Sequence, residues 1–306
     1  MRLSIDKPSL VKALTHVASV VERRNTIPIL SNVLLSAASN ELKLTATDLD
    51  IELVETVPCK AKGEGSTTVP AHMFHDIVRK LPDGSDIELT RDGEQGRLTI
   101  ACGHARFSLQ TLPADDFPSL SVEDLGHAFS LPAKDLRRLI EKTRFAISTE
   151  ETRYYLNGIY LHAVKSDGKA LLRAVATDGH RLAQVELPLP SGAKDMPGVI
   201  VPRKTVAELA RLAEDSDGDI RIELSPAKIR ISGPRVVLTS KLIDGTFPDY
   251  ERVIPQNNDK RMEVDNAAFA QAVDRVSTLS SDKGRAVKLS LSDGKLVLSV
   301  NNPDSG

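Results

Sequence analysis

The sequence Ala46-Thr47-Asp48 returns 130 residues later as Ala176-Thr177-Asp178, where it opens the longer stretch ATDGHRL that ends at Leu182. Phe117-Pro118 recurs at the same distance as Phe247-Pro248. Gly103 and Gly233, each just before a strand-like segment, are also 130 residues apart. Landmarks that share one period indicate similar structural units in tandem. The sequence therefore predicts a duplicated chain.

A third copy begins in the last part of the sequence. Met262-Glu263-Val264-Asp265 precedes a helical pattern, and two alternating stretches follow before Gly306. Measured by the 130-residue period, this unit lacks more than half of its length. Asp, Pro and Asn accumulate between the units, as is typical of linkers. We therefore expect domains at 1–125 and 126–255, and a partial third domain at 256–306.

Each unit combines helices with antiparallel strands. Leu10, Leu14, Val17 and Val21 repeat at helical spacing, and a second helical pattern in each of the first two units follows a Val-Pro pair. Alternating stretches such as 221–224 predict strands with one wet face, and seven Asp-Gly pairs supply residues for tight turns. We expect an α+β fold, with two helices packed on antiparallel sheet in each unit.

Composition excludes several classes of protein. The 306 residues carry 40 Lys and Arg against 42 Asp and Glu, and 41% are hydrophobic, which is typical of a globular protein. No apolar run approaches the roughly 18 residues of a membrane helix, so no membrane association is expected. Two cysteines without C-x-x-C spacing argue against a disulfide framework and favour a cytoplasmic location.

The near-neutral total hides a separation of charge. Segments 8–24, 70–80, 134–144 and 202–213 carry net charges of +2, +1, +3 and +2, so the rest of the chain carries −10. One interpretation is that helices simply expose Lys and Arg, which favour helix. The other is that four equivalent helices form one basic face that meets a phosphate backbone without reading its sequence.

The Thr-Asp motif has two interpretations. Asp178-Gly179 is typical of a tight turn that leaves a buried strand, and Asp48 would be the same corner in the first unit. Alternatively, two matched aspartates could share a proton, as in aspartic proteases. Those enzymes need Asp-Thr-Gly, whereas this chain has Thr-Asp-Leu and Thr-Asp-Gly. The turn is therefore the favoured interpretation, and a hydrolase is the rival.

Other chemical motifs are absent from the sequence. It contains no phosphate-binding G-x-x-x-x-G-K-[ST] loop, no G-x-G-x-x-G and no H-E-x-x-H. His72 and His75 share one helix face, but no carboxylate or cysteine pattern completes a metal site. His180 stands beside Arg181 without a nucleophile motif, which favours binding over catalysis. We expect no catalytic residues, no cofactor and no metal.

Several longer stretches carry a resemblance to a known family. They are 26–30 (TIPIL), 47–48 (TD), 107–109 (FSL), 153–158 (RYYLNG), 176–182 (ATDGHRL) and 247–250 (FPDY). With these motifs the chain resembles the bacterial sliding clamps, the β subunits of DNA polymerase III, over its whole length. The resemblance implies repeated clamp domains of the DNA clamp fold, with helices lining a hole and sheets outside.

The resemblance also implies a function. Such clamps are non-catalytic processivity factors that encircle double-stranded DNA as head-to-tail homodimeric rings, without sequence preference. A separate clamp loader places them on DNA, and they tether the replicative DNA polymerase and other proteins that carry a clamp-binding motif. The basic helices agree with a DNA-facing surface.

Site residues follow from the matching motifs. The family's peptide pocket, between the second and third domains, corresponds here to Arg153, Leu156, Thr177, Gly179, His180, Arg181, Leu182, Pro248, Arg252 and Val253. The residues expected to contact DNA by resemblance are Arg24, Arg79, Tyr154, Tyr155, Arg203 and Lys204. The charge pattern alone adds Lys12, Arg137, Arg138 and Lys142.

Two departures from the family pattern are visible. A chain that ends at Gly306 would lack the C-terminal strand of the peptide pocket and the surface that meets the partner's first domain. Gly284 stands where some clamps place a bulky apolar residue at the pocket edge. We therefore expect a pocket that lacks one wall and a ring whose closure depends on the remaining interfaces.

Overall fold

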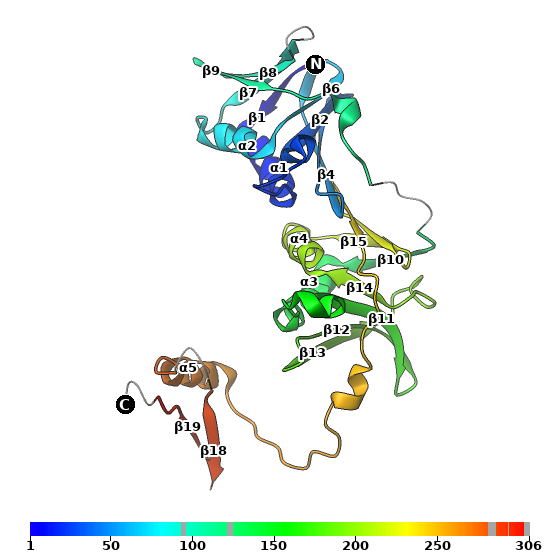
Figure 1. Cartoon of the computed structure of the whole chain (residues 1–306), viewed down its shortest axis with the longest axis vertical. Helices are drawn as coiled ribbons and strands as arrows, with labels where there is room; N and C mark the ends of the chain where they lie inside the picture. Colours follow the sequence, from blue (N-terminus) through cyan, green and yellow to red (C-terminus); the bar gives the residue numbers. More distant parts are fainter. Residues whose placement is uncertain (93–95, 121–124, 281–285, 293, 303–306) are drawn as a thin grey trace. The chain divides into compact units, whose positions relative to one another are not determined.

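The computed structural model describes residues 1–92, 96–120, 125–280, 286–292 and 294–302. The chain divides into two compact units, residues 1–247 and 248–306 (Figure 1). The larger unit contains both complete repeats found in the sequence, here called the first repeat (residues 1–120) and the second repeat (residues 125–247). Within the described residues, no helix is both long and apolar enough to cross a membrane.

The first repeat folds as two half-sheets with two helices. Its elements are β1 (Arg2–Asp6), α1 (Lys7–Val20), β2 (Asn32–Ala38), β3 (Glu41–Thr47), β4 (Ile51–Pro58), β5 (Lys60–Gly63), β6 (Gly65–Pro70), α2 (Ala71–Lys80), β7 (Asp86–Asp92), β8 (Arg97–Cys102) and β9 (Ala105–Gln110). One half-sheet has the order β5-β1-β7-β8-β9, and the other runs β4-β3-β2-β6. Every pairing is antiparallel.

The second repeat copies this arrangement. Its elements are β10 (His127–Pro132), α3 (Ala133–Glu141), β11 (Gly158–Ser166), β12 (Lys169–Thr177), β13 (Leu182–Pro188), β14 (Val199–Pro202), α4 (Arg203–Glu214), β15 (Asp219–Leu224), β16 (Lys228–Ser232) and β17 (Val236–Lys241). The order β10-β15-β16-β17 repeats β1-β7-β8-β9, and β13-β12-β11-β14 repeats β4-β3-β2-β6. The predicted duplication and the α+β class are confirmed.

A single sheet joins the two repeats. β17 pairs antiparallel with β4, from Val236 opposite Glu55 to Ser240 opposite Ile51. This pairing fuses one half-sheet from each repeat into eight strands, in the order β10-β15-β16-β17-β4-β3-β2-β6. Because buried backbone groups must be hydrogen-bonded, such a ladder satisfies two strand edges at once. The repeats therefore form one continuous body.

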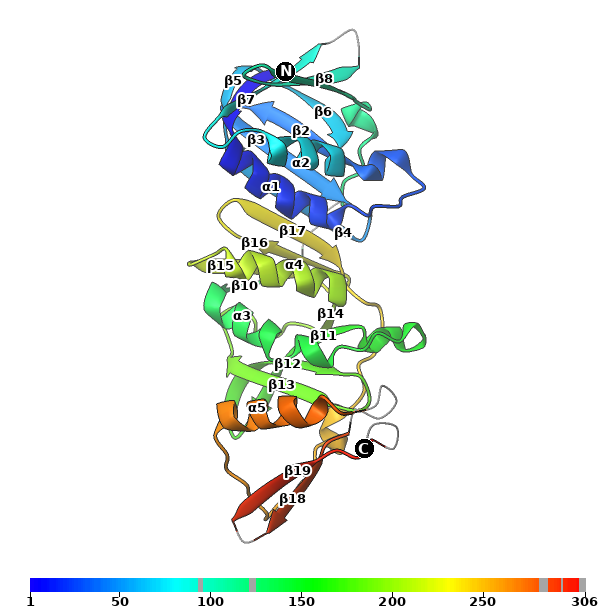
Figure 2. The same cartoon turned by 90° about the vertical axis from the view of Figure 1, so that its left-hand side faces the viewer.

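The helices cover one side of this body (Figure 2). α1 buries Leu10, Leu14 and Val17 completely, as their helical spacing predicts. Its N-terminus is capped by Asp6, whose carboxylate accepts from the backbone N–H of Ser9 at 2.9 Å. α2 and α4 begin directly after Pro70 and Pro202, the two Val-Pro pairs.

Two segments predicted as helical are shorter than expected. α1 ends at Val20, so Arg24 lies beyond the helix rather than on it. α3 ends at Glu141, which makes Lys142 its C-cap residue. Neither segment carries a glycine just after its helix, the usual signal that marks a C-terminus. The charge pattern therefore overstated the length of these two helices.

The smaller unit starts a third copy. It contains α5 (Asn266–Ser277), β18 (Lys288–Ser292) and β19 (Lys295–Ser299), and the two strands form an antiparallel pair. Asp265 caps α5 through the backbone N–H of Ala268 at 2.8 Å, as Asp6 caps α1. Met262–Asp265, which precedes α5 as β1 precedes α1, forms no strand in the described residues. A β-strand needs a neighbouring strand for its backbone hydrogen bonds, and this segment pairs with no strand among the described residues.

Candidate DNA-facing helices and partner-peptide site

The turn between β12 and β13 holds the ATDGHRL motif. The Thr177 hydroxyl donates to the carbonyl of Arg181 at 2.7 Å and accepts from the N–H of Gly179 at 3.1 Å. One carboxylate oxygen of Asp178 accepts from the backbone N–H groups of His180 and Arg181, both at 3.0 Å. These bonds build a tight turn, so the structural interpretation of the motif is confirmed.

The same turn fixes the charged side chain of Arg181. Its Nε lies 3.1 Å from the second carboxylate oxygen of Asp178, and the arginine side chain is 60% exposed. Burial opposes the charge of Asp178, but the two backbone N–H groups and the Arg181 guanidinium outweigh it and lower the pKa of this carboxyl group. Asp178 is therefore a stable anchor for an exposed guanidinium.

Gly179 gives Arg153 access to this turn. Gly179 has φ +87°, and a Cβ placed there would lie 2.7 Å from Nη1 of Arg153. The Arg153 side chain comes from the 3₁₀ helix Glu151–Leu156 and also pairs with Glu150 at 2.7 Å. Glycine thus meets two requirements, a left-handed backbone and a close approach by a neighbouring side chain. The structure brings Arg153, Gly179 and the Arg181 turn together.

The other expected peptide-site residues differ in accessibility. Leu156 is 4% exposed, so it belongs to the core in this structure, and Leu182 is partly buried. Pro248, Arg252 and Val253 lie in the smaller unit, where Val253 is 69% exposed and Arg252 pairs with Asp249 at 2.7 Å. Gly284 lies outside the described residues.

The expected DNA-contacting residues fall into two groups. The first group is exposed to solvent and consists of Arg24, Arg79, Arg138, Lys142, Tyr154 and Arg203. Within this group, the Arg79 guanidinium lies 3.6 Å from the Asp76 carboxylate. Tyr155 is partly buried and meets Tyr154 edge to face, with ring centroids 5.7 Å apart. These side chains are available to a phosphate backbone.

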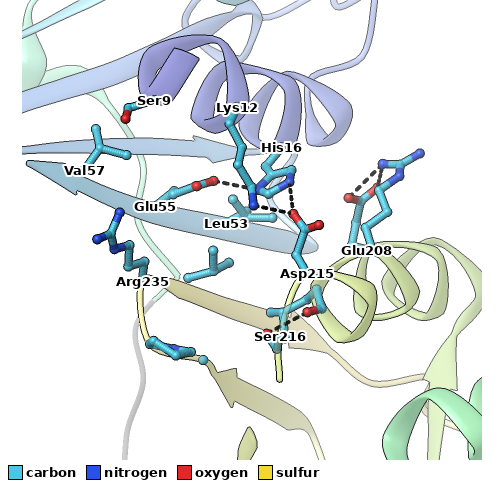
Figure 3. Close-up of a pocket in the computed structure, with 15 residues that line it drawn as sticks. Ser9, Lys12, His16, Leu53, Glu55, Val57, Glu208, Asp215, Ser216 and Arg235 are labelled. Atoms are coloured by element: carbon cyan, nitrogen blue, oxygen red, sulfur yellow. Dashed lines mark hydrogen bonds and ion pairs between the residues drawn. The ribbon is translucent and has the colours of Figure 1, made fainter. Parts of the chain in front are cut away.

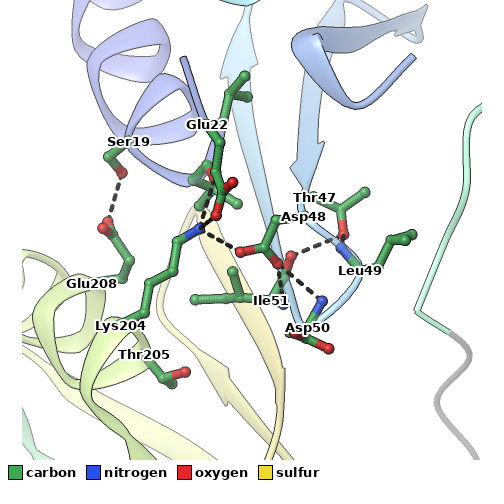
Figure 4. Close-up of polar contacts among 12 residues, drawn as sticks. Ser19, Glu22, Thr47, Asp48, Leu49, Asp50, Ile51, Lys204, Thr205 and Glu208 are labelled. Carbon is green, nitrogen blue, oxygen red and sulfur yellow. Dashed lines mark hydrogen bonds and ion pairs between the residues drawn. The ribbon is translucent and has the colours of Figure 1, made fainter. Parts of the chain in front are cut away.

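The second group is already engaged within the protein. Lys12 pairs with Asp215 at 3.1 Å. Arg137 donates to the carbonyl of Ala213 at 2.7 Å, near the C-terminus of α4. Lys204 pairs with Asp48 and donates to the carbonyl of Val20 at 3.2 Å (Figure 4). These three cations bind other parts of the fold, which weakens their assignment as DNA contacts.

Known proteins match this architecture domain by domain. The N-terminal, central and C-terminal domains of the DNA polymerase III β subunit match residues 1–121, 130–249 and 251–306. The β sliding clamp of Caulobacter vibrioides is 53% identical over 306 residues, which cover all of this chain and 82% of the relative. The chain belongs to the bacterial β sliding clamp family.

Solved clamp structures have the same fold. The Caulobacter crescentus clamp superposes with a TM-score of 0.97 at 53% identity, over 100% of this chain and 81% of that one. The Bartonella birtlesii clamp, whose structure contains bound griselimycin, gives a TM-score of 0.95 at 55% identity, over 100% and 82%. The protein is a DNA sliding clamp, a non-catalytic processivity subunit that binds DNA and tethers the polymerase.

The rival hydrolase interpretation is wrong for this clamp. Asp48 lies in a turn between β3 and β4 and accepts from the N–H groups of Asp50 and Ile51, at 2.9 and 2.8 Å. Its second oxygen pairs with Lys204, whereas Asp178 pairs with Arg181. Each carboxylate has its own cation and its own turn. A proton-sharing dyad requires instead that two carboxylates face each other.

The two helix histidines have separate partners. His75 Nε2 lies 3.1 Å from the Thr15 hydroxyl, and His72 Nε2 lies 2.9 Å from the carbonyl of Val21. The described residues contain no cluster of three or more side chains suited to hold a metal ion. These histidines therefore link α2 to α1.

A cleft that no sequence pattern predicted lies between the two repeats (Figure 3). It has a volume of about 210 Å³ and is lined by α1, β4 and the end of α4. His16 lies at its centre, with Nδ1 2.8 Å from Glu55 and Nε2 3.0 Å from Asp215. The hydrogen bond to Glu55 raises the pKa of His16 against the effect of desolvation. No local motif marks residues that meet across 39 and 199 positions.

Proposed function

We propose that this clamp encircles duplex DNA as a head-to-tail dimeric ring, with clamp domains at residues 1–125, 126–255 and 256–306. The joint between β17 and β4 is the observation that supports this most directly. Within one chain, it shows how an edge strand of one repeat pairs with an edge strand of the neighbouring repeat. The same joint, repeated between chains, generates a closed ring.

The free sheet edges support this arrangement. β9 of the first repeat corresponds to β17 of the second, and it ends its sheet without a further strand among the described residues. Beside it, Met73 and Phe107 are 57% and 40% exposed and line a groove with Ile77 and Leu81. An exposed strand edge next to exposed apolar side chains is typical of a surface that pairs with another chain. We assign this surface to a second copy.

The helix side of the body faces DNA in this proposal. Exposed positive charge comes from Arg24, Arg79, Arg138, Lys142 and Arg203. Tyr154 and Tyr155 precede Asn157, whose carbonyl accepts from the N–H of Arg203 at the start of α4 at 2.9 Å. Contacts of this kind are independent of base sequence and weaken with salt. A ring that holds DNA topologically does not need tight contacts. A separate loader opens the ring, and the clamp acts in the cytoplasm, where it meets the chromosome.

The partner site is the Arg153–Arg181 cluster, consisting of Arg153, Thr177, Gly179, His180 and Arg181. Its preformed turn and two exposed guanidinium groups support binding of an extended peptide that also buries apolar anchors. Partly buried Leu182 supplies apolar surface beside the cluster, whereas Leu156, Pro248, Arg252 and Val253 remain assigned by resemblance. We propose that griselimycin, the polymerase and other clamp-binding proteins compete for this site.

A reciprocal pair of variants tests both surfaces. His180→Ala with Arg181→Ala should weaken griselimycin binding at least tenfold by calorimetry and leave the affinity for a labelled duplex unchanged. Arg24→Glu with Arg203→Glu should leave griselimycin binding unchanged, weaken duplex binding at low salt and make its salt dependence shallower.

Primer extension with the cognate loader and polymerase gives a common readout. Both double variants should shorten the products, because one loses the polymerase and the other loses the DNA. Unchanged griselimycin affinity in the first variant would remove the turn from the peptide site. Unchanged duplex affinity at every salt concentration in the second variant would make the helix cations a solvated face only.

A further inference from the structure

Phe145 is an exposed aromatic residue on a rigid support. It lies in the 3₁₀ turn Arg144–Ala146, separated by two residues from the end of α3, and is 54% exposed. Its neighbours Ala146 and Ile147 are buried, and the N–H of Ala146 donates to the carbonyl of Thr143 at 3.0 Å. The backbone is therefore fixed while the ring points outward. A single exposed apolar side chain is common on protein surfaces, so the significance of Phe145 depends on what its ring contacts.

The ring contacts a residue of the partner site. The guanidinium carbon of Arg181 lies 5.5 Å from the centroid of the Phe145 ring, within the range of a cation–π interaction. Nε of the same guanidinium lies 3.1 Å from the Asp178 carboxylate. Arg181 is thus held between a carboxylate and an aromatic ring. Since an arginine loses several rotamers on binding, a guanidinium held in advance binds at a smaller entropic cost.

We propose that Phe145 is a further residue of the partner-peptide site. It positions Arg181 and offers its exposed ring to an apolar side chain of the peptide. The occupant is an extended peptide with apolar anchors, because the ring is continuous with the Arg153–Arg181 cluster and adds apolar surface beside its charges. This inference rests on the proposed role of that cluster, and it adds a residue that no matching motif indicated.

The test measures the affinity of the full chain for a fluorescein-labelled peptide, the clamp-binding segment of the cognate replicative polymerase. Phe145→Ala should weaken binding about three- to tenfold, whereas Phe145→Tyr, which keeps the ring, should stay within about twofold. In an Arg181→Ala background, Phe145→Ala should cost less than in the wild type, since its positioning effect has no target there. Leu112→Ala, at an exposed apolar side chain outside both proposed binding surfaces, should leave affinity unchanged.

Two further readouts separate the possible failures. The thermal midpoint of Phe145→Ala should match that of the wild type, which excludes a loss of folding as the cause. If His180→Ala weakens binding but Phe145→Ala does not, Phe145 is outside the site and the proposed function stands. If neither variant weakens binding, the peptide site itself is wrongly assigned and the role of Phe145 fails with it. Equal losses in Phe145→Ala and Phe145→Tyr would also overturn the proposal.

Discussion

Leu49 and Gly179 occupy the same position in two equivalent turns. In the first repeat, the Thr47 hydroxyl donates to the carbonyl of Ile51 at 2.9 Å and accepts from the N–H of Leu49 at 3.0 Å. Thr177 makes the same pair of bonds to Arg181 and Gly179. Both turns need a left-handed residue, with φ +78° at Leu49 and +87° at Gly179. Only the second repeat places glycine there, so the first repeat holds a strained leucine.

Leu49→Gly should therefore stabilise the clamp. Relief of the left-handed strain contributes about 1–2 kcal/mol, and the greater freedom of glycine in the unfolded chain offsets about 0.5–1 kcal/mol. The expected net gain is about 0.5–1 kcal/mol, measured by urea unfolding. Leu49→Ala is the matched control, because it removes the 38% exposed side chain but keeps the Cβ. If Leu49→Gly is no more stable than Leu49→Ala, the strain at this turn does not exceed the cost of glycine's freedom in the unfolded chain.

Residue type predicts charge but not partner. The sequence located every cation of the helical segments, yet it could not tell exposed Arg203 from Lys204, which pairs with Asp48 from the other repeat. That pairing depends on how α4 and the β3–β4 turn meet, and no local pattern encodes it. The Thr-Asp turn was predictable for the opposite reason, because all of its hydrogen bonds lie within five residues.

At the scale of elements, α1 and the end of α4 are joined by charged and polar contacts. Asp215, the C-cap residue of α4, accepts from Lys12 and His16 of α1. One turn further along α1, the Ser19 hydroxyl donates to Glu208 of α4 at 2.7 Å. The β17–β4 ladder joins the repeats through backbone bonds, and this helix pair joins them through side chains.

The protonation of His16 should make this joint depend on pH. Both ring nitrogens face carboxylates, Glu55 and Asp215, and both can donate only when the imidazole is charged. Because its pKa is raised in the folded state, His16 contributes stability that is fully present below the unfolded value of about 6.5. That contribution is lost as the pH rises through the folded pKa. The stability advantage of the wild type over His16→Gln should therefore be largest at about pH 6 and smaller at about pH 9.

Thermal unfolding midpoints of the two proteins across this range give the measurement. Taking the difference between wild type and His16→Gln removes the contributions of groups that both share. His75 is one such group, since burial lowers its pKa and gives it the opposite pH dependence. A difference that stays constant from about pH 6 to pH 9 would mean that His16 does not change its charge at this joint.

At the scale of the whole molecule, repetition made the fold predictable. Because the same 130-residue period separates the matching Ala-Thr-Asp and Phe-Pro motifs, two complete copies and the start of a third could be found without knowing any contact. The joint between copies was not predictable, because strand pairing across repeats leaves no trace in the local pattern of β4 or β17. The structure supplies that joint, and with it the geometry by which clamp domains follow one another.

This geometry leads to a prediction about assembly. If β9 binds a second copy as β17 binds β4, then Phe107, on β9 and 40% exposed, becomes buried between chains. Phe107→Asp would bury an unpaired carboxylate there, which costs several kcal/mol and should shift a dimer to monomers. Light scattering over a concentration series measures the mass. Phe145→Asp places the same charge on the other exposed phenylalanine and should leave the mass unchanged. If the wild type has a mass above that of the monomer and Phe107→Asp does not lower it, the contact between copies does not involve β9.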